Sequence, residues 1–321
     1  MSEIMTMGEI LAEIMATEIG QSFRRPGTLV GPYPGGAPAI FIDQVAKLGQ
    51  ACGIIGCVGD DDFGRLNIDR LTRDGVDVAG ISVIKEAVTG SAFVTYHKNG
   101  SRDFIFNITN SACAQLSLTQ TGETLLKDCA HFHVMGSSLF SFRIIDTMKK
   151  AIEIVKRQGG TISFDPNIRK ELLRIPEMRE ALHFILEYTD IFLPSGQEIT
   201  LLTDADREEE AIAEIIEMGV REIVLKHGGE GCSYYDATQR LSLPAFPADE
   251  VDPAGAGDCF DATFVVCRFK GMSAEDALRY ANASGALVVS RKGPMEGTST
   301  FDELNEFFRR QPWTGNTDRQ V

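Results

Sequence analysis

A regular alternation of strand-like apolar runs with helical patterns constrains the fold of this 321-residue chain more than any other feature. In each helical pattern the apolar residues recur every three or four positions, and the pattern ends near a glycine or just before the next strand. Such an alternation predicts an α/β fold with a mostly parallel sheet covered by helices on both faces. The strand-like runs are 52–59, 131–136, 161–165, 190–194 and 221–226, and the helical patterns include 141–158, 177–188 and 207–218.

Two segments interrupt the alternation and predict a second, smaller sheet. Residues 90–107 contain two strand-like runs around Asn99-Gly100, a dipeptide typical of tight hairpin turns. An earlier strand-like run, 10–15, comes before any helix. We expect these pieces to form a lid over a site or a dimer surface, from about 10–34 and 88–110. A hairpin inserted without a function would leave the same pattern.

The rest of the chain gives no sign of division. It contains no internal repeat and no linker-like stretch, so we expect one domain over residues 1–310. The tail, residues 311–321, shows no periodicity and is expected to fray.

The charge balance and the cysteine pattern narrow the class of partner. With 46 acidic and 31 basic residues the formal net charge is −15, which argues against a nucleic acid or an anionic membrane as the main partner. No apolar run approaches the roughly 18 residues of a membrane helix, and the acidic N-terminal stretch does not resemble a signal peptide. The seven cysteines are scattered without a C-x-x-C pair. We therefore expect a cytoplasmic protein.

Several common catalytic motifs do not occur. No glycine precedes a lysine, so the chain has no Walker-type phosphate loop. It has no G-x-G-x-x-G turn, which argues against a nicotinamide-dependent dehydrogenase. Neither H-E-x-x-H nor G-x-S-x-G occurs, so zinc-protease and serine-hydrolase functions are excluded. The alternating His131 and His133 have no third ligand nearby and are interpreted as ordinary strand residues.

The sharpest chemical signal lies in residues 251–269. Gly255, Ala256 and Gly257 form a tight turn directly before an apolar-periodic helix. Unpaired N–H groups and the positive end of the helix dipole therefore meet at one point, which predicts an anion site. Asp258 allows two interpretations. It is either an acidic residue favoured by the helix dipole, or a base that takes a proton from an attacking hydroxyl while the N–H groups stabilise a transferred phosphoryl group.

The run DPAGAGDCF, residues 252–260, resembles the C-terminal signature of the ribokinase-like (PfkB) carbohydrate kinases. Further segments resemble motifs of that family in the same order over residues 4–310, namely 35–39, 56–65, 164–169 and 281–293. The resemblance implies a ribokinase-like three-layer α/β/α fold with a small β-sheet lid. It also implies an enzyme that uses ATP to phosphorylate a sugar hydroxyl.

The resemblance carries roles over to individual residues. Asp258 would be the general base, and Gly255, Ala256 and Gly257 would form the anion hole. The sugar would be held by Glu13, Gly35 and Gly36, although Glu13 by its position alone is equally well a solvated strand carboxylate. The other implied contacts are Arg169 with the transferred phosphate or an acidic sugar, Lys226, Gly228, Gly231 and Asn282 with the nucleotide, and Glu198 with Mg²⁺.

Three positions depart from the family pattern. Ile40 stands where an Asn usually bonds to the sugar, so one polar contact is missing. Ser195 replaces the Asn of the N-x-x-E motif that organises Mg²⁺, and Pro253 replaces the Thr of the signature. Family members often bind a monovalent cation such as K⁺ near this loop, so K⁺ is a further candidate cofactor.

These residues resemble those of ketose and keto-sugar kinases more than those of ribokinase or adenosine kinase. We expect phosphorylation of a free ketohexose, tagatose or fructose, by a homodimer formed through the lid. An alternative is 2-keto-3-deoxygluconate kinase, for which Arg102 and Arg169 are candidate partners of the carboxylate, although Arg102 is equally well a solvated strand charge. A rival of another class is a non-catalytic sugar- or nucleotide-sensing module. Retention of Asp258 and of the intact turn argues against that rival.

Overall fold

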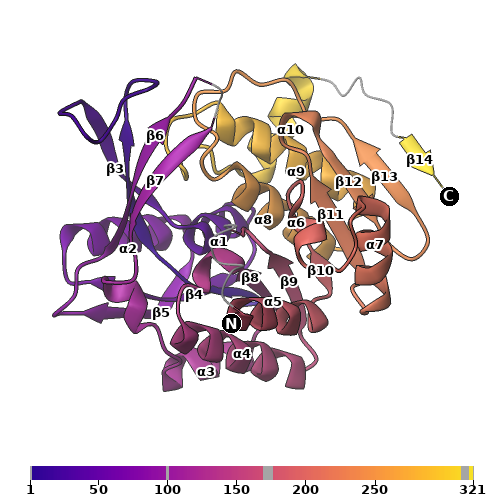
Figure 1. Ribbon diagram of the computed structural model, residues 1–321, viewed down its shortest axis with the longest axis horizontal. Helices are drawn as coiled ribbons and strands as arrows, with labels where there is room; N and C mark the ends of the chain where they lie inside the picture. The colour runs from indigo at the N-terminus through magenta and orange to yellow at the C-terminus, as the bar shows by residue number, and fades with distance from the viewer. Residues whose placement is uncertain (1, 99–100, 169–175, 312–317, 321) are drawn as a thin grey trace.

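A computed structural model describes residues 2–98, 101–168, 176–311 and 318–320. Its main element is a ten-stranded sheet in the order β14-β13-β12-β11-β10-β9-β8-β1-β4-β5 (Figure 1). The strands from β5 to β11 are parallel, and β12, β13 and β14 complete one edge in antiparallel fashion. The bounds are β1 (Ile4–Met7), β4 (Cys52–Gly59), β5 (Asp77–Ile84), β8 (His131–Met135), β9 (Thr161–Asp165), β10 (Ile191–Phe192), β11 (Glu222–Lys226), β12 (Cys232–Tyr235), β13 (Arg240–Leu243) and β14 (Asp318–Gln320).

Helices cover both faces of this sheet, and each face has its own hydrophobic core. Period-two alternation in β4 sends Ile54 and Val58 into one core and Ile55 and Cys57 into the other. The first core is closed by α1 (Ala37–Lys47), α2 (Asp62–Asp74), α8 (Ala256–Phe269), α9 (Ala274–Val289) and α10 (Phe301–Arg310). The second is closed by α3 (Gln120–Lys127), α4 (Phe142–Arg157), α5 (Pro176–Glu187), α6 (Glu198–Leu201) and α7 (Glu208–Glu217). The α/β architecture expected from the sequence is confirmed.

A separate four-stranded sheet stands beside this body, in the order β3-β2-β6-β7 (Figure 1). Its strands are β2 (Leu11–Ala16), β3 (Leu29–Gly35), β6 (Gly90–Tyr96) and β7 (Arg102–Asn107). β6 and β7 are antiparallel, as the hairpin pattern predicted, and β2 joins β6 in parallel. The proposed turn residues Asn99 and Gly100 lie outside the described residues. We refer to these four strands as the small sheet.

The C-terminal tail differs from its expectation. Asp318–Gln320 form β14, which pairs with β13, so these three residues are not frayed. An edge strand offers a row of unpaired N–H and C=O groups, and a passing segment can bond to them through its backbone alone. No periodic side-chain pattern is needed for such pairing, and the sequence therefore gave no signal for it. No helix among the described residues is both long and apolar enough to span a membrane.

Candidate active site

Two helices begin in the same way near the small sheet, and this sets the geometry of the site. α1 starts after Gly36 and α8 after Gly255, which have φ angles of 95° and 80° and provide no side-chain cap. By contrast, side chains cap the first turns of α2, α4, α9 and α10. Uncapped N–H groups at a helix start are available to a ligand, and the helix dipole favours a negative one.

The turn before α8 is packed so closely that only glycine fits at its start. A Cβ on Gly255 would lie 2.3 Å from the carbonyl oxygen of Pro294 and 3.2 Å from a side-chain carbon of Ile40. Ile40 is itself 3% exposed and presents only carbon to its surroundings. We call Gly255, Ala256 and Gly257 the anion turn.

Asp258 follows the anion turn within the first turn of α8, and its side chain is buried. Burial raises the pKa of this carboxyl well above its usual range, the neighbouring Asp165 raises it further, and the Lys226 ammonium opposes both. Within the described part of the chain no hydrogen-bond donor contacts the Asp258 carboxylate. The oxygens of this carboxyl group are thus available to a ligand.

Glu13 lies on β2 against the start of α1. Its Oε1 accepts a hydrogen bond from the N–H of Gly36 (3.4 Å), and a Cβ on Gly35 would lie 2.4 Å from the same oxygen. Gly35 therefore leaves room for the carboxylate, whereas Gly36 is required by its positive φ angle and by the carbonyl oxygen of Glu9, which would lie 2.6 Å from a Cβ. Burial raises the pKa of Glu13 to about 7, the Gly36 bond lowers it, and the positive charge of Arg102 lowers it further. Arg102 is a partly exposed residue of β7 whose guanidinium carbon lies 5.5 Å from the centre of the Phe104 ring.

A cavity of about 570 Å³ lies against the anion turn. Its lining includes every residue for which we predicted nucleotide contact, together with part of the turn itself: Lys226, Gly228, Gly231, Asn282, Ala256 and Gly257. Segments far apart in the chain therefore meet at one cavity, and the anion turn forms part of its wall.

Lys226 has a more complex setting than its predicted role suggested. Its ammonium is buried and pairs with Asp165 (3.1 Å) and with Asp261 (2.7 Å). Burial lowers the pKa of Lys226, but the two carboxylates outweigh burial and raise it, so the ammonium stays charged. The lysine therefore lines the cavity as part of a buried ion-paired group.

Glu198 begins α6 and joins two loops at the site. One carboxylate oxygen accepts the N–H of Ile168 (2.8 Å) and the other accepts that of Ser195 (2.7 Å). Burial raises the pKa of Glu198 to about 7, and the nearby Asp165 adds to this effect. Arg169, a predicted site residue that follows Ile168 in the sequence, lies outside the described residues.

The acidic side chains around Lys226 do not form a complete metal site by themselves: among the described residues no group of three or more His, Cys, Asp or Glu side chains is placed to hold a metal ion. A Mg²⁺ ion here would take its other ligands from water or from phosphate oxygens. Asp165 raises and Lys226 lowers the pKa values of Glu198, Asp258 and Asp261, and within the described part of the chain Lys226 is the cation that these three carboxyls share. Excess buried negative charge needs protons or a further cation, and carboxylate oxygen is the ligand type that Mg²⁺ prefers.

Sequence reasoning missed four buried acids at the site: Glu9, Asp165, Asp252 and Asp261. Glu9 accepts bonds from the hydroxyls of Ser137 (2.8 Å) and Ser138 (2.5 Å). Asp252 accepts the N–H groups of Ala254 (3.1 Å) and Gly293 (3.0 Å). Asp165 did carry a signal, because it ends a parallel strand and such ends converge on ligand sites. Asp261 lies within a helix and gives no comparable signal.

The chain is similar to known carbohydrate kinases over most of its length. The profile described as "pfkB family carbohydrate kinase" matches residues 1–300. Fructokinase-1 of Oryza sativa subsp. japonica is 32% identical over 312 residues, covering 94% of this chain and 96% of its own. An E. coli protein provisionally described as a ribokinase II, solved with ATP and Mg²⁺, is 58% identical with a TM-score of 0.93, covering 97% of this chain and 100% of its own. A Vibrio cholerae fructokinase solved with fructose, ADP and calcium shares the fold at 24% identity and a TM-score of 0.79, with 96% and 99% covered.

Proposed function

We propose that this chain, which belongs to the pfkB family of carbohydrate kinases and is a sugar kinase, transfers the γ-phosphate of ATP to a hydroxyl of a free ketohexose, fructose or tagatose. The observation that carries the proposal is the anion turn, which lines the cavity of about 570 Å³ and is followed directly by Asp258, a carboxyl close enough to Glu13 to interact with it electrostatically. The fructokinase relatives support a ketose as acceptor.

In this proposal each group at the site has its own role in the reaction. Asp258 accepts the proton of the sugar hydroxyl as that oxygen attacks the γ-phosphorus and the bond to the β-phosphate oxygen breaks. The N–H groups of Ala256 and Gly257 stabilise the charge on the transferred phosphoryl group. Glu13 and the N–H of Gly36 orient the sugar.

Mg²⁺, held through Glu198 and Asp165, would neutralise charge on the phosphates of ATP. Glu198 also ties the backbone at Ile168 to that at Ser195, and Ser195 lines the cavity. The ATP and Mg²⁺ in the 58%-identical relative support the use of both by this chain.

The sugar preference rests on Ile40. An apolar side chain there cannot pair a sugar hydroxyl, and a lost buried hydrogen bond costs about 1–3 kcal/mol, or roughly tenfold to a hundredfold in preference. The test is kcat/KM from ADP release with tagatose, fructose, fructose 6-phosphate, ribose, adenosine and 2-keto-3-deoxygluconate. We expect a ketohexose to lead. A lead for ribose or adenosine would contradict the proposal, and sugar and ATP binding without ADP release would support a sensing module instead.

A second candidate is 2-keto-3-deoxygluconate, and Arg102 favours it. This cation acts electrostatically on Glu13, so it lies close enough to the sugar end to attract a carboxylate. If the acid leads the panel, and Arg102→Ala removes that lead while sparing fructose turnover, the acid becomes the substrate. Arg24→Ala, at an exposed position, is the matched control.

Three further properties belong to the proposal. We propose a homodimer formed through the small sheet, a cytoplasmic location, and a site for a monovalent cation such as K⁺ near the anion turn. The seven cysteines are all buried and free, which suits a reducing compartment. Rates in K⁺ and in tetramethylammonium buffers test the cation site.

A further inference from the structure

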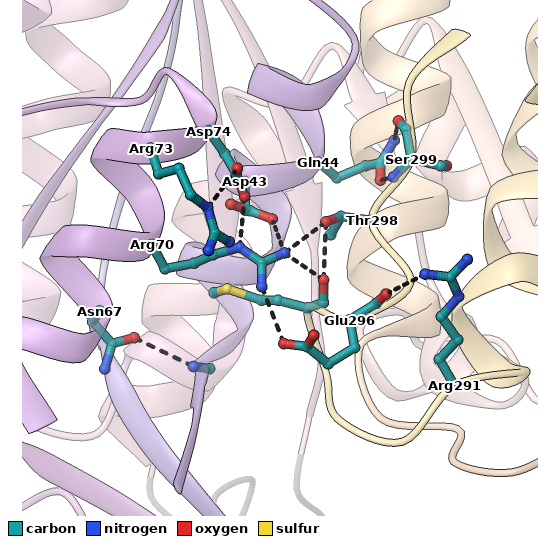
Figure 2. Close-up of polar contacts among 12 residues, drawn as sticks. Asp43, Gln44, Asn67, Arg70, Arg73, Asp74, Arg291, Glu296, Thr298 and Ser299 are labelled. Carbon is teal, nitrogen blue, oxygen red and sulfur yellow. Dashed lines mark hydrogen bonds and ion pairs between the residues drawn. The ribbon is translucent and has the colours of Figure 1, made fainter. Parts of the chain in front are cut away.

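Helix α2 lies against the small sheet, and one of its side chains bonds to two of the sheet's strands. Asn67 accepts a hydrogen bond from the N–H of Gly35 (3.3 Å) and donates one to the carbonyl of Leu11 (3.0 Å). These bonds hold the ends of β3 and β2 at the sugar side of the site. Arg70, three residues further along α2, reaches instead into the chain that follows α9 (Figure 2).

The guanidinium group of Arg70 joins three parts of the molecule. Its partners are the carbonyl of Met295 (2.6 Å), the hydroxyl of Thr298 (3.0 Å), and the carboxylates of Glu296 (3.1 Å), Asp43 on α1 (3.2 Å) and Asp74 on α2 (2.6 Å). The side chain is 11% exposed, so water competes little for these bonds. Arg70 therefore anchors residues 291–298, which we call the 291–298 segment, to α1 and α2.

The 291–298 segment packs against the small sheet. The Lys292 ammonium lies 3.8 Å from the centre of the Tyr96 ring on β6. Gly293 faces Tyr33 of β3, and a Cβ there would lie 2.7 Å from a ring carbon. Any shift of this segment would therefore move its contacts with two strands of the small sheet.

The same segment also packs against the anion turn. The N–H of Gly293 donates to the fully buried Asp252 just before the turn (3.0 Å). The carbonyl of Pro294 presses on Gly255 so closely that no Cβ fits between them. The segment is thus wedged between the small sheet and the anion turn, and Arg70 holds it from outside the site.

We propose that Arg70 is a positioning residue for phosphoryl transfer. It fixes the 291–298 segment, and this segment holds the anion turn and the small sheet in position relative to each other. The inference rests on the proposed role of the anion turn. Arg70 touches neither sugar nor nucleotide in this arrangement and acts only through the segment. The planar guanidinium is required, because a single ammonium cannot bond to a carbonyl, a hydroxyl and three carboxylates at once.

A purely structural role makes a different prediction. A brace that only adds stability would lower the unfolding temperature when removed, and would leave kcat unchanged below that temperature. A positioning residue also lowers kcat, since displacements of about 1 Å at a reacting group can cost up to roughly a hundredfold. The KM for ATP should change little, because Gly228, Gly231 and Asn282 lie on other segments.

The experiment compares Arg70→Gln with Arg268→Gln in the full-length protein. Arg268 is a matched control: it pairs bidentately with Glu222 and donates to the carbonyl of Met272, far along α8 from the anion turn. Both variants should lose thermal stability. We expect Arg70→Gln to lower kcat about tenfold to a hundredfold with less than about a twofold change in the KM for ATP, and Arg268→Gln to keep wild-type kcat. Arg70→Lys should restore part of the stability but not kcat.

Thr298→Val provides a milder test if Arg70→Gln does not fold. It removes one partner of Arg70 on the segment and should lower kcat by a smaller factor with the same unchanged KM for ATP. Wild-type kcat in folded Arg70→Gln or Thr298→Val, or an equal loss in Arg268→Gln, would overturn the inference. Asp258→Asn separates the two proposals: if it stays active, the proposed role of the anion turn fails, whereas an inactive Asp258→Asn beside a fully active Arg70→Gln removes only the inference.

Discussion

Burial determines the acid–base behaviour of the carboxylates at this site. The pKa values of Asp258 and Glu13 are both raised, each mainly because the charged form has lost its water. A carboxylate with a raised pKa is a stronger base once it ionises, which suits the removal of a proton from a weakly acidic hydroxyl. The same burial lowers the free energy of unfolding at a pH where these carboxyl groups are ionised.

Asp258→Asn tests the base directly. The amide keeps the size and polarity of the side chain but cannot accept the hydroxyl proton, so we expect kcat to fall by about a hundredfold or more. Dissociation constants for ATP and sugar, measured by calorimetry, should stay near wild type. A variant that retains wild-type kcat would remove Asp258 from the mechanism.

Glu13 predicts a specific pH dependence of stability. Its pKa rises from 4.5 in the unfolded chain to about 7 in the folded protein, so the folded state binds the extra proton between these values. This contribution to the free energy of unfolding is complete below pH 4.5 and is lost as the pH rises through 7, by about 3 kcal/mol at most. Urea unfolding at pH 5 and pH 8 should therefore show a smaller loss of stability in Glu13→Gln than in the wild type.

Glu209→Gln is the control for that comparison, since Glu209 is an exposed carboxylate on α7. Its loss of stability between pH 5 and pH 8 should equal that of the wild type. Equal losses in Glu13→Gln and the wild type would show that Glu13 does not retain its proton in the folded state.

At the scale of elements, Glu198 connects α6 to two loops, and in the proposed mechanism it also acts on Mg²⁺. Glu198→Gln keeps one acceptor oxygen but loses the charge, so one of the bonds to Ile168 and Ser195 should break. We expect a higher Mg²⁺ concentration for half-maximal rate, together with lower thermal stability. A loss of stability with an unchanged Mg²⁺ titration would assign Glu198 to loop anchoring alone.

The sequence predicted elements well where burial imposes a clear pattern. β4 and β9 have the predicted bounds, 52–59 and 161–165, because strands buried on both faces appear as continuous apolar runs. β5 was missed because its residues are mostly half-buried and show no clean alternation. β12 and β13 are four residues each and depend on their neighbours for pairing.

Only those parts of the site that carry a sequence motif could be predicted. Residues near the anion turn and the Gly35–Gly36 turn carry local signals, since their backbone shape needs glycine. The partners of Lys226 and the Arg70 network had no such signal. Each is formed by residues from separate elements that meet only in the folded chain, such as Asp43 and Thr298 around Arg70. Arg169 remains a prediction.

At the scale of the whole molecule, the small sheet carries a row of apolar side chains across three strands. Ile14, Phe93 and Ile105 are lateral neighbours on β2, β6 and β7, and Ile105 is 55% exposed. A second copy packed against this face would bury the row. We predict a dimer by light scattering at micromolar concentration, and a monomer for Ile105→Lys.

Val83→Lys is the matched control, because Val83 is 49% exposed on β5 of the central sheet. It should remain dimeric. A fully active monomeric wild type would contradict the proposed interface.

The acidic side chains beside the small sheet also bear on how a turnover ends. In the proposed reaction the buried Glu9 and Glu13 would lie near a ketohexose that arrives neutral and leaves with a phosphate group carrying up to two negative charges. Like charges at close range in a buried site repel, so the pocket favours the incoming sugar over the sugar phosphate it produces. The carboxylates that help to hold the substrate would thus also promote expulsion of the product and keep the sugar phosphate from blocking the next cycle.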